Sequence, residues 1–309
     1  MQWARTNQKV SLSTHLPHQN SQRTWAPLGF LAPGLSLLFL FLVIPIVLTV
    51  WISIHSWSML TPISTMPFVG LANYRGIFAD PVFLIALRNT WLYSLGNLAI
   101  LIPLAVLIGV LVFSVQSRVG RIVRVILFLP YVIPNVAVAI VWSYLYQPLY
   151  GPLNTILTTF GIPSQNWLGS PREALVALLL MNVWQMIGYY TVIVIAGRTE
   201  IPREYYEAAS LDGAGTWQAF WRITLPLMKR ALTFMIIIVT INSLQIFTPI
   251  YILTQGGPDN STEAVVFHMY NTAFSYLHMG QASAMAFVLF VVILCVSIVE
   301  LRLLGAFQG

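Results

Sequence analysis

Long apolar stretches separated by short polar connections set the pattern of this chain. No Asp, Glu, Lys or Arg occurs between Arg23 and Arg75, and similar gaps recur further along. A helix that crosses a bilayer needs about 20 mostly apolar residues, because backbone groups in lipid must bond within the segment. We therefore predict an all-α membrane protein with six transmembrane helices. The predicted spans are residues 27–54, 89–113, 122–146, 174–196, 231–253 and 283–304.

The tail before the first predicted span differs in composition from the span itself. Residues 1–24 are polar and rich in Ser, Thr, Gln and Asn, which predicts a flexible tail. The apolar segment that follows is too long for the core of a signal peptide and has no small-residue cleavage site at its end. We expect it to be retained as a helix, so that residues 25–309 form one transmembrane domain.

Composition agrees with this pattern and excludes other classes. Only 8% of the 309 residues are charged and 58% are apolar, whereas a soluble domain carries about 25% charged residues. The single cysteine, Cys295, excludes a disulfide scaffold. The apolar runs are unbroken, while an outer-membrane barrel would show short alternating segments.

The net charge of +6 reflects topology. Twelve of the 15 Lys and Arg residues fall in the N-terminal tail, the second and fourth connections and the C-terminus. The opposite side carries only Arg75, Arg88 and Arg172. Because basic residues collect on the cytoplasmic side, we predict that both termini are cytoplasmic. The basic residues thus indicate a lipid bilayer and no nucleic acid.

Motifs for catalysis are missing from the sequence. There is no H-E-x-x-H for zinc, no G-x-S-x-G and no G-x-x-x-x-G-K-[ST] for ATP. The predicted spans contain no Asp, and Glu300 at the end of the last span is their only acid. We therefore predict no catalytic residue, no metal ligand and no cofactor site in this chain. If the protein pumps, the energy must come from a partner.

The fourth connection, residues 197–230, is unusual because it holds four of the nine acids. Pro202 suits the first position of a helix and Glu204 complements its positive end. Gly213 and Gly215 predict a turn after residues 203–210, before a second short helix over 217–223. A solvated loop with a few ion pairs is the plainer alternative.

The exact sequence of this connection favours a specific motif over a solvated loop. Glu207-Ala208-Ala209, three residues, Gly213, nine residues, Ile223, one residue and Leu225-Pro226 match the EAA loop of bacterial ABC importer permeases. Over most of its length the chain resembles the carbohydrate-uptake permeases related to the membrane subunits of the maltose transporter. The residues that this resemblance assigns to coupling are Glu207, Ala208, Ala209, Asp212, Gly213, Ile223, Leu225 and Pro226.

The resemblance also implies a set of partners and a location. It implies a multi-pass permease of the bacterial inner membrane that pairs with a second, homologous permease subunit. Two ATPase subunits would bind ATP and Mg, and a solute-binding protein would deliver the solute. ATP binding and hydrolysis would then drive alternating access through the spans.

The resemblance places a sugar-contacting tyrosine of span four at Tyr189. Two asparagine positions of span five fall on Ser243 and Ile246, and the apolar Ile246 argues against maltose itself. Neighbouring polar and aromatic side chains complete the candidate substrate site, namely Trp184, Gln185, Asn242 and Gln245. Aromatic faces stack on sugar C–H groups and amides satisfy hydroxyls. The alternative is that these groups only hold helices together.

The solute class follows from what spans four and five lack. No basic side chain lies deep in either span, which favours a neutral sugar, oligosaccharide or polyol. The alternatives are an ABC permease for a charged solute, such as a glycerol phosphate, and a stand-alone secondary carrier or channel. The outer connections, residues 149–170 and 254–281, are expected to meet the solute-binding protein. Asp259 and Glu263 would pair with basic groups there or lie free in solvent.

Overall fold

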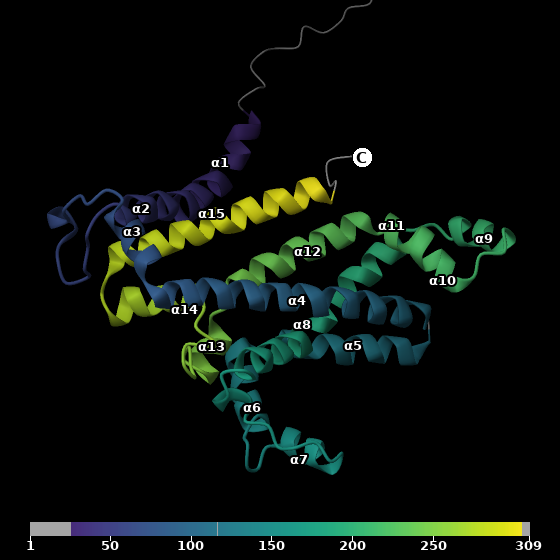
Figure 1. The fold of residues 1–309 in the computed structure, drawn as a ribbon. Coiled ribbons are helices and arrows are strands. Elements are labelled where there is room, and N and C mark those ends of the chain that lie inside the picture. The colour runs from purple at the N-terminus through teal and green to yellow at the C-terminus, as the bar shows by residue number, and fades with distance from the viewer. Residues whose placement is uncertain (1–25, 116, 305–309) are drawn as a thin grey trace, which may run out of the picture. The chain divides into compact units, whose positions relative to one another are not determined.

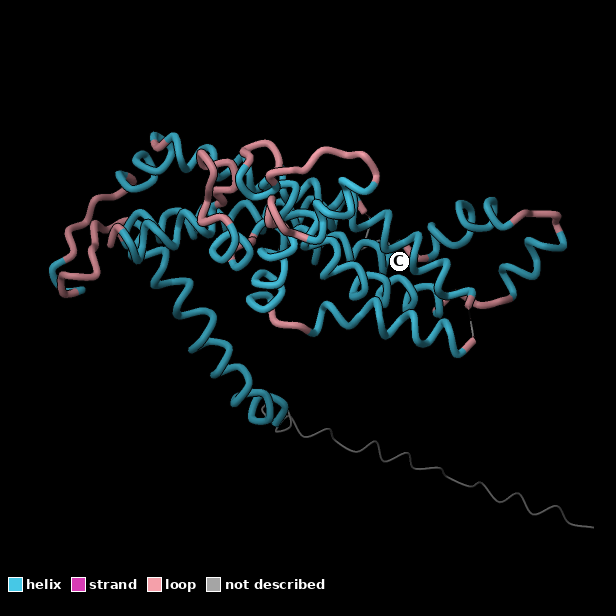
Figure 2. The backbone as a smooth tube through the Cα atoms, turned by 90° about the horizontal axis from the view of Figure 1, so that it is seen from below, coloured by secondary structure: helices cyan, strands magenta, loops and turns pink. Residues whose placement is uncertain are grey.

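The computed structural model describes residues 26–115 and 117–304, and these residues are almost entirely helical (Figures 1 and 2). No strand occurs among them; two isolated bridges, His55 to Phe68 and Ser58 to His278, are the only β-type pairs. The described residues divide into two units, with the boundary between Leu48 and Thr49. The tail predicted over residues 1–24 lies outside the described residues.

The predicted first span, residues 27–54, begins in the first unit and ends in the second, because the boundary at Leu48 lies within α2 (Ile44–Ser53). The span begins with α1 (Ala26–Leu38), continues through one π-helical turn (Phe39–Val43) and enters α2. Residues Phe30–Ser53 together form a helix of 24 residues that is long and apolar enough to cross a membrane. Its side chains are mostly exposed leucine, phenylalanine, valine and isoleucine, which is typical of a surface that faces lipid.

The second unit contains the other spans. Its first long helix, α4 (Pro81–Ser114), begins eight residues before the predicted start of the second span. The Asp80 carboxylate accepts a hydrogen bond from the Val82 amide at 2.9 Å, and Pro81 occupies the first helical position, where no N–H is needed. Arg88 therefore lies within the helix, and its charge does not mark a boundary.

The third span, which the sequence predicts over residues 122–146, is interrupted in the structure. α5 (Arg118–Val132) and α6 (Asn135–Leu145) meet at an angle of 98°. Pro134 lacks an N–H and disfavours a helical conformation at Ile133, so the helix stops there.

The remaining elements follow the predicted order. A short helix α7 (Pro152–Thr159) and a 3-10 turn (Trp167–Gly169) lead to α8 (Ala174–Thr199), the fourth span. The fifth span consists of α12 (Lys229–Leu244) and α13 (Thr248–Leu253), and the sixth is α15 (Met279–Leu303). Between the last two spans lie α14 (Val265–Tyr270) and a π-helical turn (Asn271–Ser275), and α3 (Ala72–Ala79) precedes α4.

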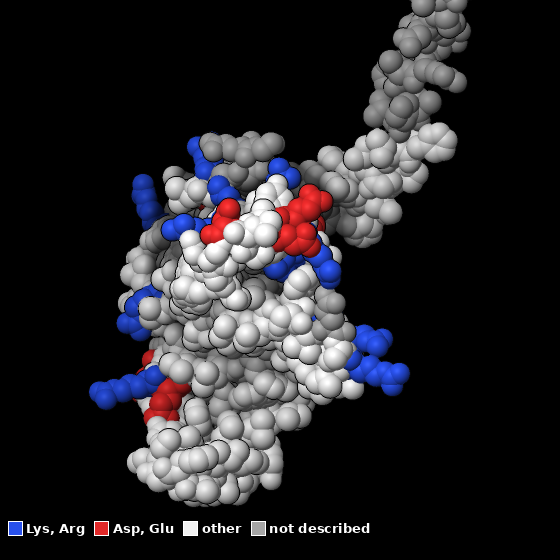
Figure 3. Space-filling model, turned by 90° about the vertical axis from the view of Figure 1, so that its right-hand side faces the viewer, with Lys and Arg blue, Asp and Glu red and all other residues white. Residues whose placement is uncertain are grey.

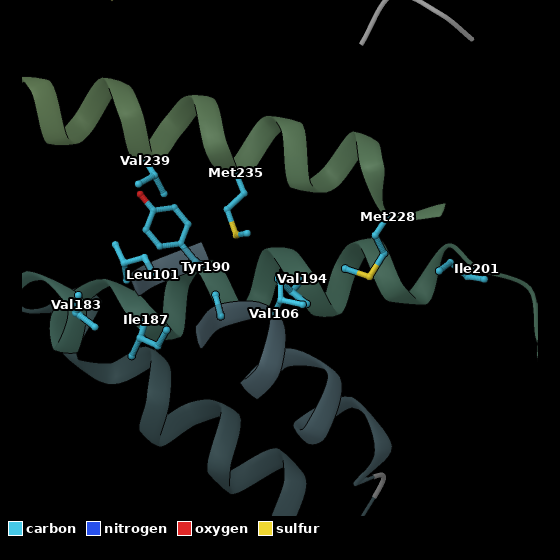
Figure 4. Close-up of a cluster of buried hydrophobic side chains, with 11 residues drawn as sticks. Leu101, Val106, Val183, Ile187, Tyr190, Val194, Ile201, Met228, Met235 and Val239 are labelled. Carbon is cyan, nitrogen blue, oxygen red and sulfur yellow. The ribbon is translucent and has the colours of Figure 1, made fainter. Parts of the chain in front are cut away.

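The largest buried cluster joins α4, α8 and α12 (Figure 4). Leu101 of α4, Tyr190 and Val194 of α8 and Met235 of α12 are each almost fully buried in it. A Cβ atom at Gly109 of α4 would overlap the Val194 side chain. The absence of a side chain at Gly109 thus allows α4 and α8 to pack closely, as small residues do in membrane helix pairs.

Near the N-terminal end of α4, the connection after α13 is held on this helix by hydrogen bonds. The Asn89 side-chain amide donates to the carbonyl oxygens of Asn260 at 2.8 Å and Glu263 at 3.0 Å. The Thr90 hydroxyl accepts from the Val265 amide at 3.0 Å. Residues 260–265 therefore form a fixed part of the helical framework.

A buried histidine strengthens this attachment. His268 Nδ1 lies 3.0 Å from Glu263 Oε1, and its Nε2 lies 3.2 Å from Asp80 Oδ2. Burial lowers the pKa of His268, but the two carboxylates outweigh burial and raise the pKa above its ordinary value. The Glu263 side chain is only 7% exposed. It is paired within the chain, contrary to the expectation that it is presented to a partner, whereas Asp259 is exposed.

The His268 pair predicts a pH dependence of stability. Because the folded pKa is raised, the pair stabilises the fold fully below a pH of about 6.5, and this contribution is lost as the pH rises through the folded pKa. The melting temperature of His268→Gln should thus fall below that of the unchanged protein at acidic pH, with the gap closing at alkaline pH. His278→Gln is the control, because His278 is exposed. A gap that widens toward alkaline pH would contradict the assignment.

Candidate functional site

A cavity of about 760 Å³ lies where the two broken spans meet α4 and α8. None of its lining residues, all within the described part of the chain, is Asp, Glu, Lys, Arg or His. The lining comprises Tyr93 and Leu101 of α4, residues 131–135 between α5 and α6, Asn182, Met186, Tyr189 and Tyr190 of α8, and Asn242, Ser243 and residues 245–249 around the end of α12. Its surface is therefore uncharged, with aromatic, amide and hydroxyl groups beside apolar side chains such as Leu101 and Met186.

The break between α5 and α6 needs a substitute hydrogen-bond partner, because it frees backbone groups within the bilayer. Gln185 of α8 supplies one. Its amide donates to the Ile133 carbonyl oxygen at 3.2 Å and to Asn135 Oδ1 at 2.8 Å. Gln185 is only 2% exposed, so it lies behind the cavity wall and holds the bend in place.

Two tyrosines form an aromatic wall. The rings of Tyr131 and Tyr189 stack with centroids 4.5 Å apart and an interplanar angle of 17°. Tyr190 lies edge-on to Tyr189 at 5.1 Å. α5 and α8 can approach this closely because Gly188 has no side chain. A Cβ at this position would overlap the Leu127 carbonyl oxygen. A glycine thus brings together two aromatic faces from different helices.

The second break, residues 245–247 between α12 and α13, forms the opposite side of the lining. The last carbonyl groups of a helix have no partner within it, so this break adds backbone acceptors near the cavity. Asn242 and Gln245 are exposed, whereas Ser243 and Ile246 are buried. Ile246 also packs in a buried apolar cluster of this unit.

The structure brings together five of the seven residues predicted for the substrate site. Those that line the cavity are Tyr189, Asn242, Ser243, Gln245 and Ile246. The other two, Gln185 and Trp184, do not line it. Trp184 is 43% exposed and contacts the edge of Trp142 at 5.5 Å.

Tyr131 is one of the lining residues that the predicted substrate site did not include. The sequence does contain a signal for a helix break beside Tyr131, because Pro130 and Pro134 lie close together in an apolar span and such prolines interrupt helices.

Asn182 has a second role in addition to its place in the lining. Its amide donates to Asn97 Oδ1 of α4 at 2.6 Å, so it also holds α4 and α8 together.

The connection after α8 forms the predicted helix, turn and helix. Its first helix is α9 (Glu204–Leu211) and its second is α10 (Thr216–Ala219), which continues through a π-helical turn (Phe220–Thr224) into α11 (Leu225–Leu227). Pro202 lies two residues before α9 and not at its first position. Gly213 has φ +79°, a conformation that glycine adopts without steric cost.

The predicted coupling residues divide into an exposed set and an anchoring set. Glu207, Ala208, Asp212, Gly213 and Pro226 are exposed, and Ala209 is half-buried. Ile223 and Leu225 pack against the buried cluster of α4, α8 and α12. The Tyr206 hydroxyl lies 2.9 Å from the Thr224 hydroxyl and joins the two arms of the loop.

Large apolar side chains are also exposed on this loop. Leu211 is 89% exposed and Trp217 is 72% exposed. Apolar groups that gather on a surface mark a contact site. Figure 3 shows this end of the molecule, with acidic side chains grouped on the loop and basic ones around it.

Comparison with known proteins now identifies the family. The family described as binding-protein-dependent transport system inner membrane component matches residues 101–304. The chain belongs to this family. It is 33% identical to the trehalose/maltose transport system permease protein MalF of Thermococcus litoralis over 92% of this chain and 95% of the relative. It is 32% identical to the arabinooligosaccharides transport system permease protein AraP of Bacillus subtilis over 92% and 90%.

A solved structure supports the same fold. One chain of a bacterial ABC transporter involved in the import of the acidic polysaccharide alginate superposes with a TM-score of 0.80, at 22% identity. The match covers 93% of this chain and 98% of that one. This family member is thus a multi-pass ABC importer permease, a transport component and not an enzyme. Within residues 26–115 and 117–304, no group of three or more His, Cys, Asp or Glu could hold a metal ion.

The close approach of α5 and α8 gives a prediction. Gly188→Ala places a methyl group against the Leu127 carbonyl, so the helices must separate at a cost of about 1–3 kcal/mol. The melting temperature of the purified protein should fall accordingly. Gly76→Ala is the matched control, because its Cβ would meet only the Gln281 side chain at 3.6 Å. Equal melting temperatures for the two variants would show that the helices are not in contact at Gly188.

Proposed function

We propose that this permease forms part of the pathway of an ATP-driven importer for a neutral sugar, oligosaccharide or polyol, and that the solute passes through the cavity described above. The observation that carries this proposal is the cavity lining. It offers aromatic faces, amides and hydroxyls, and among its described residues no Asp, Glu, Lys, Arg or His. Sugars present C–H faces that stack on aromatic rings and hydroxyls that pair with amides.

Two of the relatives support a sugar or oligosaccharide as the solute. The two curated relatives belong to systems for trehalose/maltose and for arabinooligosaccharides. A charged solute, such as a glycerol phosphate, would need a charged group to offset its desolvation, and this cavity provides none. A stand-alone secondary carrier usually has an acid near the middle of the membrane, which the lining also lacks.

The individual roles follow from position. Tyr131 and Tyr189 stack on the solute, while Asn242, Ser243 and Gln245 bind its hydroxyls and Ile246 contributes an apolar contact. Two further residues act from behind the wall: Gln185 holds the α5–α6 bend and Trp184 packs against α6. Alternating access would open and close the cavity as α5, α8 and α12 move relative to one another.

The connection over residues 197–230 couples the solute pathway to the ATPase subunits. Glu207, Ala208, Ala209 and Asp212 would dock on one of two partner ATPase subunits, which bind ATP and Mg. The exposed Leu211 and Trp217 side chains add apolar contact area to this interface. Anchoring through Ile223 and Leu225, the second of which precedes the exposed Pro226, would transmit movement of the ATPase to the spans. This end of the bundle, together with both termini, faces the cytoplasm.

Two further partners complete the assembly. A second, homologous permease would supply the other half of the pathway. A solute-binding protein would dock on the outer connections, residues 149–170 and 254–281, where Asp259 is exposed. A solved alginate ABC transporter, similar in fold to this chain, was crystallised in complex with a pentasaccharide-bound periplasmic protein.

The aromatic wall can be tested with the solute that a binding screen finds for the cognate solute-binding protein. Tyr189→Ala removes one stacked ring, so the solute concentration for half-maximal uptake should rise about tenfold, equivalent to ~1.4 kcal/mol. Tyr189→Phe keeps the ring and should transport nearly normally. Uptake by membrane vesicles measures both variants. Normal uptake by Tyr189→Ala would remove this residue from the pathway.

The coupling loop can be tested at Gly213. Its positive φ disfavours any other residue by roughly 1–2 kcal/mol, although an added Cβ would meet nothing within 4 Å. Gly213→Val should therefore spare membrane insertion but change the angle between α9 and α10. ATP hydrolysis by the assembled transporter would then no longer respond to solute.

Gly215→Val is the matched control for this test. Gly215 also has open space around it, but its φ is −72°. Solute-stimulated ATP hydrolysis should be retained in this variant. If Gly213→Val also retains it, the loop is not the coupling element.

A further inference from the structure

A second cavity, of about 570 Å³, lies at the coupling-loop end of the bundle. The end of α4, the start of α5, the end of α8 and the residues before α9 enclose it. Four arginines line it: Arg121, Arg124, Arg198 and Arg203. No Asp or Glu is among its lining residues, so the cavity is strongly positive.

Two of these arginines, Arg124 and Arg198, are held by groups that do not neutralise them. The Arg198 guanidinium lies over the rings of Tyr206 at 3.9 Å and Phe113 at 4.8 Å. Arg124 Nη2 donates to the Val112 carbonyl oxygen at 3.3 Å, while its Nε is buried with no hydrogen-bond partner. In the described part of the chain, the ion pairs within 4.0 Å all involve His268 and none involves an arginine.

A cluster of arginines without an acidic partner favours the binding of an anion. Arg124 and Arg198 are half-buried, whereas Arg121 and Arg203 are exposed. Positive charges that converge on one space raise the free energy of the folded protein unless an anion binds there. Guanidinium groups bind phosphate oxygens in pairs through parallel N–H bonds. A phosphate group therefore matches both the charge and the donor geometry of this cavity, which we call the arginine pocket.

The position of the arginine pocket indicates where the phosphate comes from. The pocket lies level with the ends of three spans, at Ser114 of α4, Arg118 of α5 and Thr199 of α8, which is the depth of lipid headgroups. Beside it, α5 exposes Ile122 and Val125, a surface suited to an acyl chain. Basic pockets between spans on the cytoplasmic side are typical sites for anionic headgroups.

We propose that the arginine pocket binds the phosphate group of an anionic phospholipid from the leaflet on the coupling-loop side. The bound headgroup joins α5 and α8 to the start of the coupling loop, because Arg203 directly precedes α9 and Arg198 contacts Tyr206 within it. Loss of the lipid therefore loosens the connection between the loop and the spans. The proposal rests on the membrane location of the chain and is independent of the solute cavity.

The test uses the transporter purified with its partner subunits and delipidated in detergent. Phosphatidylglycerol and phosphatidylcholine are the probes, and native mass spectrometry measures how many molecules of each remain bound. The unchanged protein should retain phosphatidylglycerol in preference to phosphatidylcholine. Arg121→Gln with Arg203→Gln should weaken that binding about 30-fold, because two basic contacts contribute ~2 kcal/mol at 1.4 kcal/mol per decade.

The matched control removes two charges from the same end of the bundle but outside the pocket. Arg222→Gln with Lys229→Gln should leave phosphatidylglycerol binding within about twofold of the unchanged protein. Arg121 and Arg203 are exposed, so the pocket variant should keep the melting temperature of the unchanged protein, which is measured in parallel. Equal loss of lipid in both double variants, or in neither, would overturn the proposal.

Two other outcomes would assign the arginines to a different anion. In the first, inorganic phosphate binding depends on Arg121 and Arg203 while phosphatidylglycerol binding does not, so the ligand is soluble phosphate. In the second, the pocket variant loses its ATPase subunits but keeps its lipid, so the arginines contact a protein. Both outcomes overturn the lipid assignment, and neither changes the expected effect of Tyr189→Ala on uptake.

Discussion

Every backbone group that a broken helix frees inside a bilayer needs a new hydrogen-bond partner, and this constraint shapes the centre of the molecule. The third span is interrupted at Pro134, between α5 and α6. The buried Gln185 amide donates hydrogen bonds to the Ile133 carbonyl oxygen and to Asn135 Oδ1. The fifth span breaks in the same region, before Thr248. Because both interruptions face one space, a cavity forms where the helices stop, and its polar surface comes partly from the same residues that stabilise the breaks.

Much of the fold could be predicted from the positions of charged residues. The fourth and sixth spans, predicted over 174–196 and 283–304, are found at Ala174–Thr199 and Met279–Leu303. α4 begins earlier than predicted because the Asp80 cap, and not the charge of Arg88, decides where that helix starts. Pro134 indicates that a helix stops but not in which direction the chain continues. The 98° bend therefore depends on contacts between helices, which a hydropathy pattern does not contain.

The candidate site shows a similar division. Tyr189 could be reached by counting from the coupling motif, because that spacing lies within one continuous stretch of chain. Tyr131 could not, since its stacking depends on how closely α5 approaches α8 at Gly188. The partners of Gln185, which are Ile133 and Asn135, lie far from it in the sequence. Glu263 pairs with the nearby His268, which in turn contacts Asp80, 188 positions away. Their roles inside the fold become clear only when those partners are brought together.

The attachment of residues 260–265 to α4 has a mechanical consequence. α4 is one continuous helix of 34 residues, which corresponds to a length of about 50 Å at 1.5 Å per residue. Its N-terminal end carries the hydrogen bonds from Asn89 and Thr90, and its other end reaches the cavity that Phe113 and Val115 help to line. Because α4 is continuous, a displacement of residues 260–265 would shift both of its ends together, over a length that exceeds the roughly 30 Å hydrocarbon core of a bilayer.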